Sequence, residues 1–196
     1  MKKKIILLLV ISLLLSLVSC GDEPEKEPTV FERLNSMMSQ SYTYATLTVR
    51  EESQLGRISG TYEMTASKED VTVVYDFELF ATFDPESEPS DTQKTTHSGY
   101  MKVRDGKIVE QNGDRCNISI GEIYGGNLKF YEEYFENVSE GELSLSASVV
   151  NPYGFMGVNG ATNMSVQVSF GDRINSIFID YVAGSGSKIS IEYTLR

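Results

Sequence analysis

The chain has 196 residues, with 28 acidic and 17 basic side chains and a formal net charge of −11. A surface this acidic repels the phosphates of nucleic acids, which excludes nucleic-acid binding as a primary role. Two cysteines, one histidine and no tryptophan leave too few ligands for most zinc sites, iron–sulfur clusters or disulfide scaffolds, so we expect no cofactor and no bound metal.

Residues 1–19 have the features of a secretory signal peptide. Lysines at positions 2–4 precede an apolar run from Ile5 to Val18, which is shorter than the roughly 20 residues that a membrane span needs. The run closes with Leu17-Val18-Ser19-Cys20, which resembles the lipobox of bacterial lipoproteins. This resemblance implies cleavage before Cys20, acylation of Cys20 with fatty acids such as palmitate, and anchoring in the cell envelope outside the cytoplasm. The alternative is an ordinary secretory signal in which Cys20 has no role.

Residues 20–28 are expected to form an acidic tether behind the lipidated cysteine. The segment from Gly21 to Pro28 carries charges and two prolines and has no apolar side chain able to join a core. Fully extended, its eight residues reach at most roughly 26 to 29 Å. The acidic residues after Cys20 are also similar to the surface-export signal of Bacteroidota lipoproteins, which would place the protein on the outer-membrane surface. An acidic linker explains them equally well.

Residues 29–196 are interpreted as a single β-rich domain that opens with a short helix. Thr29 and Glu32 fit a capping box, in which each side chain hydrogen-bonds the other residue's backbone N–H. Phe31, Leu34 and Met38 then lie on one stripe of the helix.

From Tyr42 onward the hydrophobic period changes to two, which predicts β-strands. The longest case runs from Asp70 to Phe83 and places seven apolar side chains on one face: Val71, Val73, Tyr75, Phe77, Leu79, Ala81 and Phe83. The other face is mostly polar, as in antiparallel sheets with one solvated side.

Turn signals divide the remaining strands. Asp105-Gly106 predicts a two-residue hairpin of the primed type, because both residues tolerate positive φ. Asn112-Gly113 predicts another turn before a strand at residues 115–120. Residues 164–195 predict a three-stranded meander with turns at Gly171 and Gly184.

A second helix is predicted within residues 127–140. It rests on apolar residues spaced by three, four and three, namely Leu128, Tyr131, Phe135 and Val138. A strand from Glu142 to Val150 follows. The total is about ten strands and two helices.

Few residues suggest chemistry. His97 has no second histidine to work with and is expected to be a structural residue on a strand. Cys116 is expected to be a buried thiol, with a reactive thiol as the alternative. Two acidic groups do not match the spacing of a calcium loop and are interpreted as solvated surface: Asp84, Glu86, Glu88 and Asp91, and Glu132, Glu133, Glu136, Glu140 and Glu142.

The connection from Asn151 to Gly160 is unusual because it is apolar and rich in glycine. An apolar loop must bury itself or bind something. We therefore expect that it either closes the core or forms the lip of an apolar pocket or a contact surface. Its candidate ligand-binding residues are Tyr153, Phe155, Met156 and Val158.

The predicted fold is mainly β, a single antiparallel curved sheet of about ten strands, forming a half-barrel or open barrel with one or two short helices. This layout resembles the lipoprotein-carrier fold of the LolA/LppX type, which implies a half-barrel that holds acyl chains. A β-sandwich or a closed lipocalin-like barrel is the alternative.

The expected function is that of a non-enzymatic, lipid-anchored binding module outside the cytoplasm, with an apolar ligand and with the membrane as partner through its lipid. One alternative is a structural or adhesive surface protein that binds another macromolecule. A hydrolase is the remaining alternative.

Overall fold

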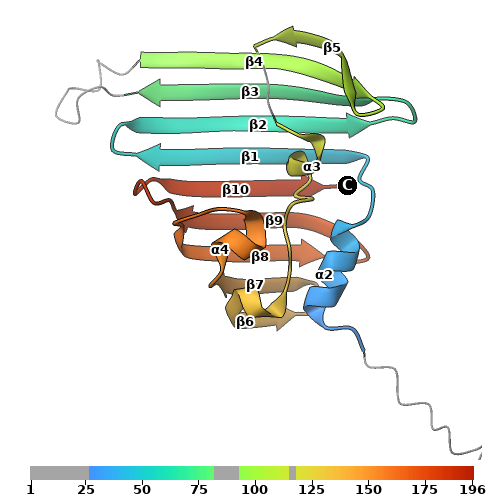
Figure 1. Ribbon diagram of the computed structural model, residues 1–196, viewed down its shortest axis with the longest axis vertical. Helices are drawn as coiled ribbons and strands as arrows, with labels where there is room; N and C mark the ends of the chain where they lie inside the picture. Colours follow the sequence, from blue (N-terminus) through green and yellow to red (C-terminus); the bar gives the residue numbers. More distant parts are fainter. Residues whose placement is uncertain (1–26, 82–92, 115–117) are drawn as a thin grey trace, which may run out of the picture.

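The computed structural model describes residues 27–81, 93–114 and 118–196, and every structural statement below refers to these residues. The expected signal peptide, the expected lipidation site Cys20, the acidic segment from Asp84 to Asp91 and Cys116 lie outside them. Within the described ranges the chain forms one antiparallel sheet of ten strands (Figure 1).

The sheet is open, with the strand order β5-β4-β3-β2-β1-β10-β9-β8-β7-β6. The prediction of a single curved antiparallel sheet is therefore confirmed, and the sandwich and the closed barrel are not formed. The strands are β1 Tyr44–Ser53, β2 Gly56–Ala66, β3 Val71–Ala81, β4 Gln93–Arg104, β5 Lys107–Gly113, β6 Phe135–Gly141, β7 Ser144–Val149, β8 Thr162–Phe170, β9 Ile174–Val182 and β10 Lys188–Leu195.

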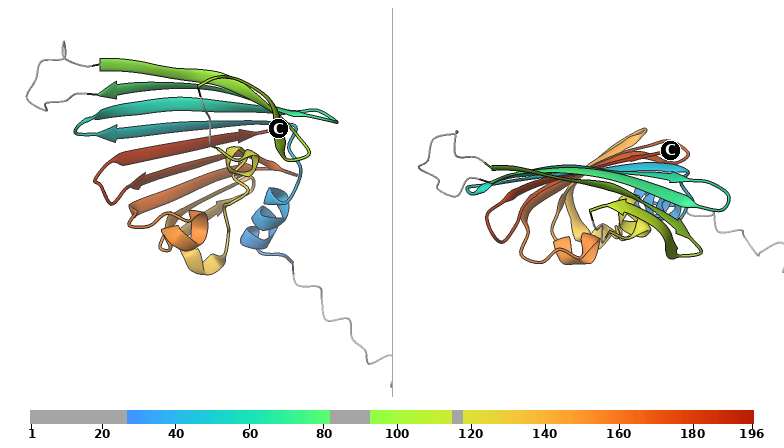
Figure 2. Two further views of the ribbon diagram at one scale, coloured as in Figure 1. Left: turned by 45° about the horizontal axis from the view of Figure 1, so that its top comes forward. Right: turned by 90° about the horizontal axis from the view of Figure 1, so that it is seen from above.

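The helices all lie on the inner, concave side of the sheet (Figures 1 and 2). They are α2 Val30–Met38, α3 Ile120–Ile123 and α4 Pro152–Met156, with a 3-10 turn η2 at Glu132–Tyr134. The predicted capping box of α2 is present, because the backbone N–H of Glu32 donates to Thr29 Oγ1 at 3.2 Å and that of Thr29 donates to Glu32 Oε2 at 2.7 Å. The inner-facing residues Phe31, Leu34 and Met38 of α2 are buried, as expected.

The chain visits the two edges of the sheet one after the other. It first runs outward from β1 to the edge strand β5, and it then crosses the inner face through residues 118–134 to the opposite edge at β6. From β6 it returns strand by strand to β10, which pairs with β1. The crossing segment therefore lies over the middle of the inner face, where it covers the core (Figure 2).

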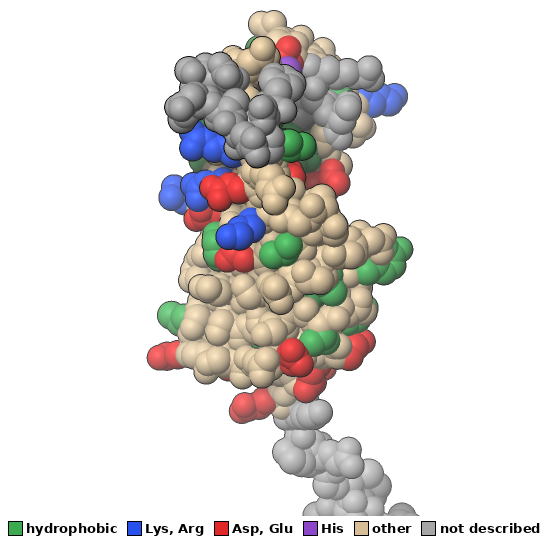
Figure 3. Space-filling model, turned by 90° about the vertical axis from the view of Figure 1, so that its left-hand side faces the viewer, with side chains coloured by type: hydrophobic (Ala, Val, Ile, Leu, Met, Phe, Trp, Pro, Cys, Tyr) green, Lys and Arg blue, Asp and Glu red, His purple; other side chains and the backbone are tan. Residues whose placement is uncertain are grey.

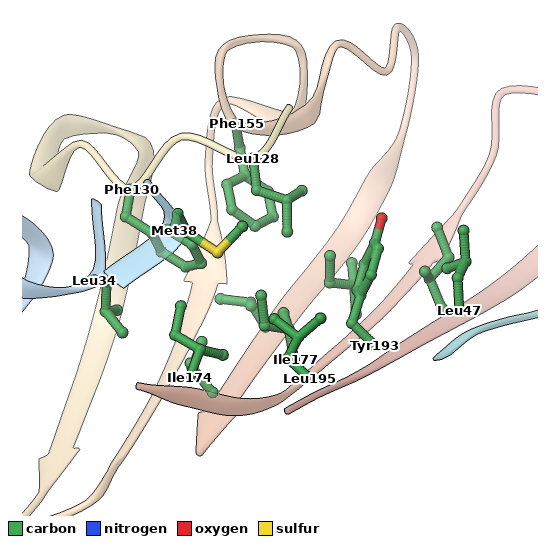
Figure 4. Packing of buried hydrophobic residues seen from close by; sticks show 14 of the residues in the cluster. Leu34, Met38, Leu47, Leu128, Phe130, Phe155, Ile174, Ile177, Tyr193 and Leu195 are labelled. Atoms are coloured by element: carbon green, nitrogen blue, oxygen red, sulfur yellow. The ribbon is translucent and has the colours of Figure 1, made fainter. Parts of the chain in front are cut away.

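The core consists of inner-face strand residues packed against the helices and the crossing segment (Figure 4). Phe155 of α4 lies edge-on to Phe130 and Phe135, with ring centroids 5.4 and 5.3 Å apart. Phe31 of α2 stacks on Phe135 at 5.2 Å. This aromatic group joins α2, α4 and the crossing segment to the β6 edge.

The predicted helix at residues 127–140 is wrong, because this segment forms the end of the crossing, η2 and the edge strand β6. Pairing with β7 outweighs the local pattern. The ladder is irregular between Glu136 and Ser139, and Asn137 has a φ of 52°. A bulge shifts the alternation of a strand by one residue, so the apolar spacing imitates that of a helix.

The predicted strand at 115–120 is also corrected, because its described end begins a helix. Ser119 caps α3, and its Oγ accepts the backbone N–H of Glu122 at 3.2 Å. The three-stranded meander at the C-terminus is confirmed as β8, β9 and β10.

The primed hairpin at Asp105-Gly106 is confirmed. The two residues have φ values of 51° and 73° and connect β4 to β5, with Arg104 opposite Lys107. A Cβ atom added at Gly106 would meet nothing within 4 Å, so the turn constrains this position through its backbone conformation alone.

We therefore expect Gly106→Val to lower the free energy of unfolding by about 1 kcal/mol or more, because a β-branched residue is forced into positive φ. Asparagine tolerates this region, so Gly106→Asn is the matched control and should lose much less. Urea denaturation of both variants measures the difference. Equal stability of the two variants would contradict the proposed cause.

Candidate functional site

The inner face of the sheet is covered in its middle and left accessible in two places. A pocket of about 400 Å³ lies where the end of α2 and the start of the crossing segment meet strands β2 and β3. We call it the α2–α3 pocket. Its lining residues are Met38, Ser39, Gln40, Ser41, Tyr42, Met64, Ala66, Val71, Ile120, Tyr124 and Gly126.

Seven of the eleven residues that line the α2–α3 pocket have apolar or aromatic side chains. The hydroxyl of one of them, Tyr42, is engaged by the protein. Tyr42 donates to the backbone carbonyl of Met37 at 3.0 Å, and its ring lies 6.3 Å from that of Tyr124. Burial raises the pKa of Tyr42, although a backbone hydrogen bond at Ile174 and the nearby Arg173 oppose the shift. The polar residues Ser39, Gln40 and Ser41 form one side of the pocket. An apolar group in the pocket therefore meets thioether, aromatic and aliphatic surface on one side and polar surface on the other.

Two hydrogen bonds attach α2 to the crossing segment above the sheet. Asn35 donates through Nδ2 to the backbone carbonyl of Phe130 at 2.6 Å and accepts the backbone N–H of Phe130 through Oδ1 at 3.0 Å. Arg33 of α2 also forms an ion pair with Glu140 of β6 at 2.7 Å, with both side chains partly exposed. These contacts hold α2 in position over the inner face.

The second accessible part of the inner face lies at the far end of β1, β2, β3 and β10. No helix lies over the left-hand halves of these strands in Figure 1. Five half-buried apolar residues form this surface, which we call the distal strip: Val49, Ile58, Phe77, Leu79 and Ile189. Phe77 lies across Gly60 on the neighbouring strand, where an added Cβ would fall 1.9 Å from the ring. The glycine therefore lets the aromatic ring lie flat on the sheet.

The segment from Asn151 to Gly160 contains α4, which the sequence did not predict. Asn151 caps it by accepting the backbone N–H of Gly154 at 2.9 Å. Phe155 is completely buried, as the core-closing interpretation expects, and Tyr153 is 65% exposed. Met156 and Val158 are half-buried against the core. None of the four residues lines the α2–α3 pocket, and their role in ligand binding stays a prediction.

His97 lies on β4 with its imidazole exposed, and its Nδ1 is 3.3 Å from Oδ2 of Asp114. The described residues contain no group of three or more His, Cys, Asp or Glu side chains placed to hold a metal ion. The shifted carboxyl groups of Asp70 and Glu110 have pKa values lowered by hydrogen bonds from Arg104 and Tyr100. A general acid requires the opposite shift.

A deeply buried ionisable side chain on the inner face, Tyr193, is also unsuited to acid–base chemistry near neutral pH. Burial raises the pKa of Tyr193 on β10 to about 12, with smaller contributions from Glu122 and Tyr181. Its phenol stands between Leu47 and Ile177 on the neighbouring strands (Figure 4). Tyr193 therefore remains neutral.

Comparison with known proteins gives no family for this chain. No family model and no curated protein matches it. Among solved structures, the chain is similar to the dehydratase domain from the CurF module of curacin polyketide synthase, with 8% sequence identity and a TM-score of 0.20. The alignment covers 84% of this chain and 79% of that domain. A likeness this weak carries no functional argument.

The burial of Phe155 leads to a stability prediction for α4. Phe155→Ala should lower the free energy of unfolding by about 3 kcal/mol, because it removes the ring that packs against Phe130 and leaves a cavity in the core. Tyr153→Ala on the same helix removes an exposed ring and should change stability by less than about 0.5 kcal/mol. Chemical denaturation compares the two variants, and similar losses would show that Phe155 does not close the core.

Proposed function

We propose that this protein is a lipid-anchored binding module outside the cytoplasm that holds an apolar ligand in the α2–α3 pocket. The observation that carries the proposal is the pocket itself. Its volume of about 400 Å³ lies within the usual range for small-molecule sites, and seven of its eleven lining residues have apolar or aromatic side chains. The open sheet supports it, because an unclosed inner face gives a ligand a route to the core surface.

The pocket also has the polar rim that an apolar ligand site usually has. Ser39, Gln40 and Ser41 line the pocket and lie in the short connection between the end of α2 and the start of β1. Apolar burial provides most of the affinity in such sites, and a few polar groups orient the ligand. Nothing in this arrangement requires a reaction, which agrees with a binding role.

Attachment to a membrane rests on the sequence alone. Cys20 ends an apolar run with lipobox spacing, and acylation there would tether the domain through residues 21–28. The described residues contain no helix long and apolar enough to cross a membrane. The proposed attachment, a lipid on Cys20, is argued from the lipobox spacing.

Filling the pocket tests the binding proposal. Ala66 lies at the end of β2 and lines the pocket, whereas Thr65 beside it is exposed on the other face of the same strand. Ala66→Phe should weaken binding of the neutral apolar fluorophore N-phenyl-1-naphthylamine about tenfold, equivalent to about 1.4 kcal/mol. Thr65→Phe is the matched control and should bind like the wild type.

Fluorescence titration gives both affinities, and thermal unfolding confirms that both variants are folded. A wild type that does not bind the fluorophore would contradict the proposal. Equal binding by Ala66→Phe and the wild type would place the ligand elsewhere.

The proposed anchor has a separate test. Cys20→Ser should accumulate as an unprocessed precursor and should no longer incorporate radioactive palmitate in growing cells, because the thiol is the acylation site. Labelling is measured on the immunoprecipitated protein. A mutant that is still labelled would show that Cys20 is not the attachment point.

A further inference from the structure

Glu51 occupies a position where the pattern of β1 requires an apolar residue. The inner-facing residues of this strand are Ala45, Leu47 and Val49, and Glu51 is the next in the series. Its register partners are Ile58 on β2 and Ile189 on β10, both apolar members of the distal strip. The residue as a whole is half-buried there. An interruption of this kind, in a strand that otherwise follows its pattern, is expected at functional sites.

Glu51 has no ion-pair partner among the described residues. Three basic residues occupy neighbouring positions, but the alternation of the strands places them on the outer face of the sheet: Arg50, Arg57 and Lys188. Arg57 there lies 4.3 Å from the centre of the Phe80 ring. Figure 3 shows basic side chains gathered near the upper strands, beside acidic ones. The sequence that connects β3 to β4, residues 82–92, contains no lysine or arginine.

Aromatic and aliphatic surface surrounds the carboxylate. Tyr181 on β9 is the register partner of Ile189 and is 9% exposed. Ile189 lies between Tyr181 and Glu51 in the register, and burial raises the pKa of Tyr181 with a smaller contribution from the negative charge of Glu51. Phe77 and Leu79 extend the apolar surface on β3. His97, opposite Phe77, is positioned against Asp114 and not against Glu51.

We propose that the distal strip binds an organic cation with an apolar tail, for which Glu51 supplies the counter-charge. Glu51 lies between apolar residues and has no ion-pair partner among the described residues, and a ligand cation would pair its carboxylate. The flat aromatic surface favours both the tail and a neighbouring positive charge. The net charge of −11 attracts cations to the molecule and repels anions.

The distal strip is separate from the α2–α3 pocket. Ala45, opposite the pocket residue Met64, is six residues from Glu51 along β1. Six residues of a strand span about 20 Å, so a ligand on the strip need not touch the pocket. This inference therefore stands independently of the proposed pocket function.

Decylammonium and decanoate have the same tail and opposite charges, which makes them suitable probes. Isothermal titration calorimetry below their micellar concentrations should show about tenfold tighter binding of decylammonium by the wild type. Glu51→Gln should abolish this preference. Glu52→Gln is the matched control, because Glu52 is the next residue on the same strand and is exposed on the outer face, and it should keep the preference.

Glu51→Lys provides a second variant, and it should reverse the preference towards decanoate. Circular dichroism confirms that each variant is folded. Equal affinity of the wild type for both probes, or binding of neither, would overturn the proposal. A loss in Glu52→Gln as large as that in Glu51→Gln would also overturn it, since the effect would then come from overall charge.

Discussion

The pairing of β1 with β10 in the middle of the sheet is the constraint on which the rest of the structure depends. Eight residue pairs, from Ala45–Leu195 to Glu52–Lys188, join the first strand of the domain to the last. Strands β1 to β5 follow one another towards one edge, and strands β10 to β6 follow one another towards the other. The consecutive strands β5 and β6 therefore lie at opposite edges. Residues 118–134 must then cross the inner face, where Leu128 and Phe130 are buried. The crossing covers the middle of that face and leaves the α2–α3 pocket and the distal strip accessible.

Much of the fold could be predicted from local sequence signals. The capping box at Thr29, the alternation along β3 and the turn at Asp105-Gly106 each depend on a few neighbouring residues, and the structure confirms all three. The edge strand β6 could not be recognised, because its bulge near Asn137 breaks the period of two. Two short helices were missed despite readable signals. Ser119 and Glu122 repeat the capping box of α2, and Asn151 followed by proline starts α4.

The accessible parts of the inner face could not be predicted in the same way, because their residues come from strands far apart in the sequence. Met38, Met64 and Ile120 look like ordinary core residues, and only the crossing of the chain leaves space between them. One of the two interpretations of the loop residue Phe155 was that it closes the core, and its complete burial agrees with this interpretation. Glu51 did leave a local signal, since it interrupts the apolar alternation of β1. Its significance depends on Ile58 and Ile189, whose positions beside it follow from the strand order.

Native mass spectrometry of the mature protein, released gently from membranes of its host, tests ligand binding on the inner face most directly. We expect a population whose mass exceeds that of the chain with its proposed acyl anchor by a small apolar molecule, which is released when the ion is activated by collisions. The same preparation of Ala66→Phe should carry less of it, because the introduced ring occupies the α2–α3 pocket. A wild type that is observed only at the mass of the chain and its anchor would contradict a ligand-binding role.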